Sequence, residues 1–78
     1  MSSPNVLITG CSSGVGMQTA VLLAQEGYYV YATMRDLKKS EKLVELSKPY
    51  QKNIEILTLD VQDEKSIAQV VTYIIARD

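Results

Sequence analysis

The stretch Thr9–Gly16 has the sequence TGCSSGVG, and it lies between a short apolar run and a segment with helical periodicity. The apolar run Val6–Ile8 predicts a buried strand, and the segment Gly14–Glu26 predicts a helix that Gly27 ends. Glycines between them let the backbone turn sharply and let a phosphate approach without a Cβ in the way. Free N–H groups and the positive end of the helix dipole then face the anion. The stretch therefore predicts a loop that binds a phosphate or a dinucleotide, with turn chemistry alone as the alternative.

Two further strand-and-helix pairs follow along the chain. Tyr28–Thr33 is rich in tyrosine and valine and predicts a second strand, and residues 36–47 predict a helix that stops before Pro49. Ile54–Leu59 predicts a third strand, and Asp63 is placed to cap the helix that follows it. Strands separated by helices of this length need crossover connections, so they form a parallel sheet. The sequence therefore predicts an α/β fold with the order β-α-β-α-β-α.

Composition excludes several classes of protein. The chain has 78 residues, of which 46% are hydrophobic and 22% are charged, so it forms at most one globular domain and is neither disordered nor membrane-embedded. Its single cysteine, Cys11, excludes an internal disulfide, and the absence of histidine excludes a Cys/His zinc site. The net charge of −1 gives no reason to expect a nucleic-acid partner. The start of the chain has no signal-peptide pattern, and a lone cysteine suits a reducing compartment, so we expect a cytoplasmic protein.

The glycines of Thr9–Gly16 have the TGxxxGxG spacing of the short-chain dehydrogenases/reductases, in the compact branch of that family. Tyr31–Leu37 and Leu59–Val61 look like the vertebrate subgroup that includes hydroxysteroid and retinol dehydrogenases, and the similarity covers essentially all of the chain. No Gly-Lys-Ser/Thr follows the loop, which excludes a P-loop. The resemblance implies that residues 1–78 are the NAD(P)-binding half of a Rossmann-like domain. This half would be the N-terminal part of a doubly wound parallel sheet with strand order 3-2-1, incomplete without the following strands.

The resemblance also implies which residues bind the cofactor. Ser12 and Ser13 would lie close to the adenosine ribose and its phosphate, and the Val15 backbone would face the pyrophosphate. Asp60 would bond the adenine amino group, and Val61 would pack on the ring. The alternative for Asp60 is a strand-end residue that caps a turn. The complete set of cofactor-binding residues that we predict is Gly10, Ser12, Ser13, Gly14, Val15, Gly16, Arg35, Asp60 and Val61.

The end of the second predicted strand favours NADP over NAD. In NAD-binding proteins a carboxylate at that place binds the ribose 2′-hydroxyl, but this chain has Met34 there, followed by Arg35. A guanidinium can hold a 2′-phosphate with charge-assisted hydrogen bonds, although a solvated arginine is the alternative. Asp36 is either a ligand of an NAD ribose or the cap of the next helix. Residues 35–52 carry a net charge of +3, from six basic and three acidic side chains, which is either a solvated face or a positive rim beside the anion.

The catalytic groups of the family are missing from this sequence. The family uses a serine and a Tyr-x-x-x-Lys pair, but Tyr50 is followed four places on by Ile54 and Tyr73 by Arg77. We therefore predict no catalytic residue and no metal site. The expected function is the cofactor-binding segment of an NADP(H)-dependent oxidoreductase that acts on a lipophilic alcohol or ketone, such as a steroid or retinoid. The alternatives are a catalytically inactive nucleotide-binding module, or an interaction fragment whose exposed first strand pairs with another chain, and a homo-oligomer is left open.

Overall fold

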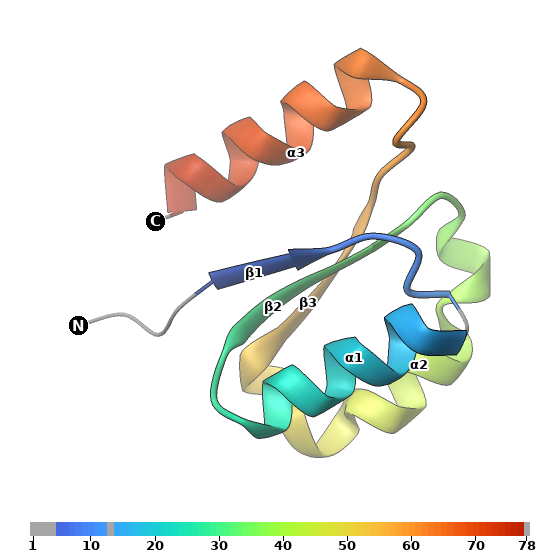
Figure 1. The fold of residues 1–78 in the computed structure, drawn as a ribbon, viewed down its shortest axis with the longest axis vertical. Helices are drawn as coiled ribbons and strands as arrows, with labels where there is room; N and C mark the ends of the chain where they lie inside the picture. Colours follow the sequence, from blue (N-terminus) through green and yellow to red (C-terminus); the bar gives the residue numbers. More distant parts are fainter. Residues whose placement is uncertain (1–4, 13, 78) are drawn as a thin grey trace.

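The computed structural model describes residues 5–12 and 14–77, in which strands and helices alternate along the chain (Figure 1). The strands and α-helices are β1 (Asn5–Ile8), α1 (Gly14–Gln25), β2 (Tyr29–Met34), α2 (Glu41–Ser47), β3 (Ile54–Thr58) and α3 (Glu64–Arg77). Two short 3-10 helices, η1 (Leu37–Lys39) and η2 (Lys48–Asn53), flank α2. The predicted β-α-β-α-β-α order is thereby confirmed.

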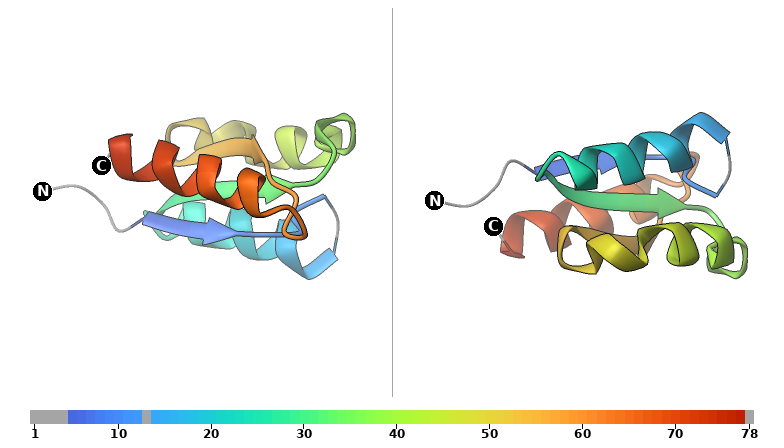
Figure 2. Two further views of the ribbon diagram at one scale, coloured as in Figure 1. Left: turned by 90° about the horizontal axis from the view of Figure 1, so that it is seen from above. Right: turned by 90° about the horizontal axis from the view of Figure 1, so that it is seen from below.

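The three strands form one parallel sheet with the order β1-β2-β3, which is the predicted order 3-2-1 counted from the other edge. Val30 in the central strand lies opposite Val6 of β1 and Ile54 of β3. Helices α1 and α2 cover one face of the sheet, and α3 crosses the other face (Figure 2). A sheet covered on both faces is typical of parallel α/β proteins.

The core lies between the sheet and the α1–α2 face. The central strand β2 contributes Val30, Ala32 and Met34 to this core. Helix α1 contributes Ala20 and Ala24, and α2 contributes Leu43. The small alanines let α1 approach the strand closely. Gly27 ends α1 in the left-handed region at φ 95°, as the sequence predicts. None of the helices in the described part of the chain is long and apolar enough to cross a membrane.

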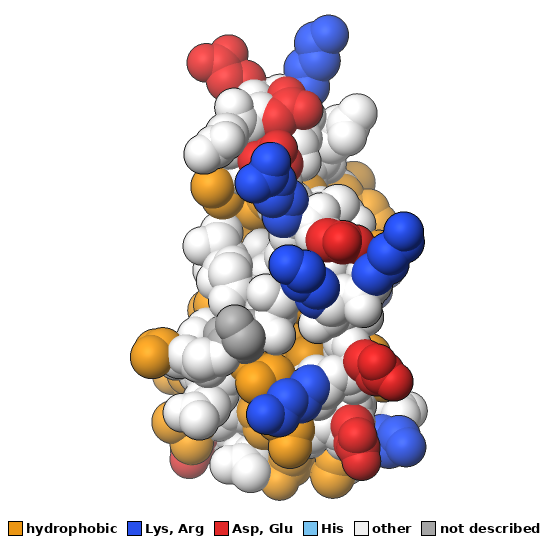
Figure 3. Space-filling model, turned by 90° about the vertical axis from the view of Figure 1, so that its right-hand side faces the viewer, with side chains coloured by type: hydrophobic (Ala, Val, Ile, Leu, Met, Phe, Trp, Pro, Cys, Tyr) orange, Lys and Arg blue, Asp and Glu red, His pale blue; other side chains and the backbone are white. Residues whose placement is uncertain are grey.

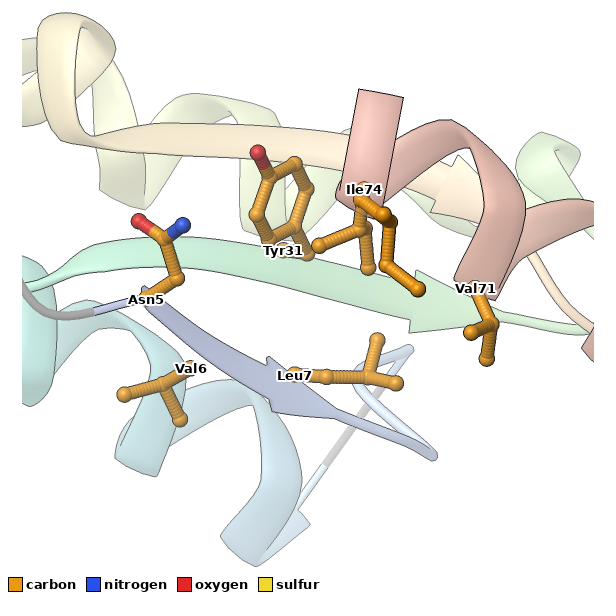
Figure 4. Close-up of a pocket in the computed structure, with 7 residues that line it drawn as sticks. Asn5, Val6, Leu7, Tyr31, Val71 and Ile74 are labelled. Atoms are coloured by element: carbon orange, nitrogen blue, oxygen red, sulfur yellow. The ribbon is translucent and has the colours of Figure 1, made fainter. Parts of the chain in front are cut away.

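The predicted buried strand at the start of the chain is only half-buried. Leu7 of β1 is 42% exposed because β1 has a strand neighbour on one side only within residues 5–12 and 14–77. An apolar hollow of about 170 Å³ opens between β1 and α3, where Tyr31 and Ile74 meet (Figure 4). The residues that line this hollow are Asn5, Val6, Leu7, Tyr31, Val71, Ile74 and Ile75. The sheet is therefore open at β1, as expected for a partial Rossmann-like fold.

The predicted helix over residues 36–47 is divided at Ser40 into η1 and α2, so this part of the prediction is wrong in detail. The first turn is tightened because the Lys39 N–H donates to the Asp36 carbonyl oxygen over three residues. Asp36 also caps this turn through its carboxylate, which accepts from the Lys38 N–H at 2.9 Å. Asp63 caps α3 in the same way, since its carboxylate accepts from the Lys65 N–H at 3.0 Å.

Candidate functional site

The carboxyl ends of the three strands meet at one edge of the sheet, and a pocket of about 230 Å³ lies there. Its residues come from the segments that follow β1, β2 and β3 and are Thr9, Gly10, Arg35, Leu59, Asp60, Val61 and Gln62. Figure 3 looks onto this side of the molecule, where basic and acidic side chains are interspersed. Ligands of open parallel α/β sheets bind outside the carboxyl ends of the strands, so the pocket has the expected position.

The loop between β1 and α1 needs glycine at three positions for two different reasons. Gly10 and Gly14 lie in the left-handed region at φ 67° and φ 63°, which side chains disfavour. Gly16 is needed for space, because an added Cβ would lie 2.9 Å from the Gly10 carbonyl carbon and closer still to its oxygen. The first turn of α1 consequently packs against the loop backbone. The N–H groups of that turn have no acceptor inside the helix, so they are available to an anion.

The loop is anchored to the sheet through Cys11. The Cys11 N–H donates to the Thr33 carbonyl oxygen at 3.0 Å, and the thiol is fully buried against the Ile8 carbonyl oxygen at 3.3 Å. Burial raises the pKa of the Cys11 thiol, and the smaller effect of the hydrogen bond with the Thr33 backbone lowers it. A buried thiol with a raised pKa stays protonated at neutral pH. Cys11 is therefore a small packing residue under the loop rather than a reactive thiol.

Asp60 caps the turn that follows β3. Its carboxylate oxygen Oδ1 accepts from the Gln62 N–H at 3.0 Å, and its own N–H donates to the Ser66 hydroxyl at 3.0 Å. The other carboxylate oxygen, Oδ2, lies 3.8 Å from Nε of Arg35. Arg35 directly follows β2 and lines the pocket. Within the protein, Asp60 is thus a strand-end residue that caps a turn. Val61, beside it, is 58% exposed and presents an apolar side chain to the pocket.

Four of the nine predicted cofactor-binding residues, Gly10, Arg35, Asp60 and Val61, line this one pocket. Gly14, Val15 and Gly16 form the first turn of α1, and Val15 is 80% exposed. Ser12 lies in the loop before α1, and Ser13 lies outside the described residues.

Three lining residues, Thr9, Leu59 and Gln62, were not predicted. Thr9 opens the TGxxxGxG motif and Leu59 belongs to the Leu59–Val61 segment, whereas the only sequence signal of Gln62 is its position after a strand end. Met34, at the end of β2, points into the core and is 2% exposed, so Arg35 is the residue that faces the pocket there. The part of the chain that the structure describes contains no group of three or more His, Cys, Asp or Glu side chains that could hold a metal ion.

A tyrosine and a basic residue do lie four places apart on α3, but at the other end of the sheet. Arg77 donates from Nη1 to the Tyr73 hydroxyl at 3.0 Å, and this hydroxyl donates to Glu55 near the amino end of β3. The hydrogen bond to Glu55 raises the pKa of Tyr73. A proton-transferring tyrosine needs the opposite shift. Tyr73 and Arg77 therefore attach α3 to β3, at the end of the sheet away from the pocket.

The comparison with known families agrees with this geometry. The model of the short chain dehydrogenase family matches residues 4–77. The chain belongs to the short-chain dehydrogenase family. This membership agrees with the glycine loop at the end of β1 and with the parallel sheet order.

Two curated relatives illustrate where the chain stands in the family. It is 51% identical over 69 residues to 17-beta-hydroxysteroid dehydrogenase type 1 of Mus musculus, covering 81% of this chain and 20% of the relative. It is 42% identical over 73 residues to retinol dehydrogenase 8 of Homo sapiens, covering 88% of this chain and 24% of the relative. The chain thus spans a fifth to a quarter of the length of these relatives.

Solved structures of the family contain the same fold. ElxO with NADP bound matches with a TM-score of 0.85 and 33% identity, over 96% of this chain and 30% of that protein. A metagenomic short-chain oxidoreductase in complex with NADP matches with a TM-score of 0.85 and 26% identity, over 99% of this chain and 35% of that protein. The three strands and their helices correspond to the N-terminal, Rossmann-like part of such structures.

Proposed function

We propose that this chain binds NADP(H) and is the cofactor-binding half of a Rossmann-like domain over residues 1–78. The observation that carries the proposal is the pocket at the carboxyl edge of the sheet. Gly10, Arg35 and Asp60 come from three segments far apart in the sequence, and they line this pocket together. Two structural neighbours in the family are named as NADP complexes, which supports the same cofactor class.

The residues present fit a dinucleotide. Gly16 packs the first turn of α1 against the Gly10 backbone, and the Cβ positions of Gly10 and Gly14 face open space, so a pyrophosphate can approach bare backbone at the start of α1. The N–H groups of Gly14 and Val15 face the pyrophosphate in this proposal. Asp60 and Val61 serve the adenine ring, and Ser12 and Ser13 serve the ribose and its phosphate. The cofactor, once bound, supplies the hydride that is exchanged with an alcohol or a ketone.

NADP is favoured over NAD by the end of β2. Arg35 has a side chain that is 75% exposed at the pocket, whereas Met34 is buried and provides no carboxylate for a ribose hydroxyl. Asp36 caps η1, since its Oδ1 accepts from the Lys38 N–H, which gives this carboxylate a structural role that does not depend on an NAD ribose. The remaining cation at the pocket mouth suits a 2′-phosphate.

We further propose that the activity to which this chain contributes is oxidation or reduction of a lipophilic alcohol or ketone. The names of the relatives point to a steroid or a retinoid. The sequence has no Tyr-x-x-x-Lys, so the chain itself holds the cofactor but lacks the proton-transferring pair. The pocket described here therefore accounts for binding of the cofactor and not for recognition of the substrate.

Titration of the protein with NADPH tests the proposal. Gly14→Ala should weaken NADPH binding at least about tenfold, because a side chain at φ 63° shifts the loop away from the pyrophosphate. Gly27→Ala is the matched control, because Gly27 also has a positive φ, of 95°, but ends α1 away from the pocket. Equal NADPH affinity of both variants and the parent protein would contradict the loop assignment.

A second candidate function is pairing with another chain through β1. It is favoured by the exposure of Leu7 (42%) and Ile75 (69%) beside the hollow between β1 and α3. A strand added to a free sheet edge is a common mode of recognition. A clean monomer in sedimentation velocity across a wide concentration range would exclude self-pairing. A stable dimer without NADPH binding would favour this function over the first.

A further inference from the structure

Arg35 and Asp60 are paired with each other across the pocket that is proposed to bind the adenosine end of the dinucleotide. Nε of Arg35 lies 3.8 Å from Oδ2 of Asp60, and both residues line the pocket. They come from the ends of β2 and β3, which are neighbours in the sheet. The two groups that would contact the adenosine end of the cofactor are thus neighbours of opposite charge.

The two partners differ in how firmly they are held. Both the side chain and the backbone of Asp60 are held by hydrogen bonds, because its Oδ1 accepts from the Gln62 N–H and its backbone N–H donates to the Ser66 hydroxyl on α3. Its side chain is 34% exposed, whereas that of Arg35 is 75% exposed. A long exposed side chain changes rotamer easily, so Arg35 is the partner that moves when a stronger anion arrives. The Asp60 carboxylate stays in place beside that anion.

We propose that Asp60 limits the preference of this site for a 2′-phosphorylated dinucleotide, because its carboxylate competes with the 2′-phosphate for Arg35. This inference rests on the proposed function. NADPH carries the 2′-phosphate and must draw Arg35 away from Asp60. NADH carries a hydroxyl at the same position and leaves the pair closed. Asp60 also repels the phosphate directly, since both carry negative charge. Both effects weaken NADPH binding and leave NADH binding unaffected.

The ratio of NADPH to NADH affinity isolates this effect. A contact of Asp60 with the adenine amino group is common to both dinucleotides, so its loss cancels in the ratio. Exposed ion pairs are weak, which sets the expected size of the change: neutralising Asp60 should raise the ratio about two- to fivefold at low salt. Screening by salt should reduce the gain, because the Debye length falls to about 3 Å at 1 M.

The experiment measures Kd for NADPH and NADH at 20 mM and at about 1 M salt. The variant Asp60→Asn keeps an oxygen for the Gln62 N–H but removes the charge, and Asp60→Ser keeps a turn-capping hydroxyl if the asparagine disturbs the fold. Glu64→Gln is the matched control, since it removes the same charge from an exposed residue nearby that does not line the pocket. A further pair, Arg35→Gln with and without Asp60→Asn, completes a double-mutant cycle.

The expected result is a higher ratio in Asp60→Asn and Asp60→Ser at low salt, no change in Glu64→Gln, and a smaller gain in the Arg35→Gln background. If the parent protein binds NADPH and the Asp60 variants have the same or a lower ratio of NADPH to NADH affinity than the parent, the inference is overturned and the proposed function still stands. A parent protein that binds neither dinucleotide overturns the proposed function, and the inference with it.

Discussion

Glu55 is the carboxylate through which α3 is attached to the sheet, and replacing it should loosen that helix. Its oxygen Oε1 accepts from the Tyr29 hydroxyl at 2.9 Å and lies 3.5 Å from Nη2 of Arg77. Its other oxygen accepts from the Tyr73 hydroxyl. Tyr29 belongs to β2, whereas Tyr73 and Arg77 belong to α3. Glu55→Ala therefore removes one polar centre that joins two strands and the helix above them.

The size of the effect follows from the exposure of these groups. The bond from Tyr29 is partly buried and has a charged acceptor, and such a bond contributes about 1.5–3 kcal/mol at most. The contacts of Tyr73 and Arg77 are exposed, so the ion pair adds little. We expect Glu55→Ala to lower the free energy of unfolding by about 1–2 kcal/mol. In a domain of this size that corresponds to a decrease in Tm of roughly 5–10 °C.

Urea and thermal unfolding followed by circular dichroism measure this loss at pH 7. Amide hydrogen exchange then shows whether α3 is affected, because Glu55→Ala removes the hydrogen bond from Tyr73 and the ion pair with Arg77, so the α3 amides should exchange faster. Glu45→Ala is the matched control, since Glu45 is an exposed glutamate on α2 with no ion pair in the described part of the chain. Equal unfolding free energies of Glu55→Ala and Glu45→Ala, or unchanged exchange in α3, would refute this account of how α3 is held.

Three further outcomes are expected. Arg35→Ala should weaken NADPH binding by about 1–3 kcal/mol and NADH binding far less, measured by titration calorimetry, and equal weakening of both would exclude NADP selectivity at this residue. Gly16→Ala should lower the unfolding free energy more than Gly14→Ala, because only at Gly16 does a Cβ meet backbone, and the reverse order in urea unfolding would contradict the packing of α1 on the loop. Burial, and after it the hydrogen bond to Glu55, raises the pKa of Tyr29 from its usual value of 10.0. The unfolded state therefore loses this proton first, and the free energy of unfolding should fall as pH rises above 10.0. A constant free energy of unfolding through this pH range would contradict the shift.

Local chemistry explains why so much of this chain is predictable from its sequence. A helix end is set by the residues next to it, so the capping roles of Asp36 and Asp63 and the glycine end of α1 at Gly27 follow from a few neighbouring positions. The alternation of strands and helices is also a short-range pattern. The TGxxxGxG spacing in Thr9–Gly16 concerns contacts within one loop, and it was enough to place the chain in its family.

Burial and pairing depend instead on residues that are distant in sequence. Val6–Ile8 has the composition of a buried strand, but the exposure of Leu7 depends on how many strands lie beside β1. The sequence around Arg35 does not indicate that it lies beside Asp60. The two residues meet because β2 and β3 pair in parallel register, which brings their carboxyl ends together. Glu55 likewise becomes the anchor of α3 only because the chain crosses back over the sheet. A sequence pattern records the preference of each segment, whereas these contacts exist only once the segments are packed against one another.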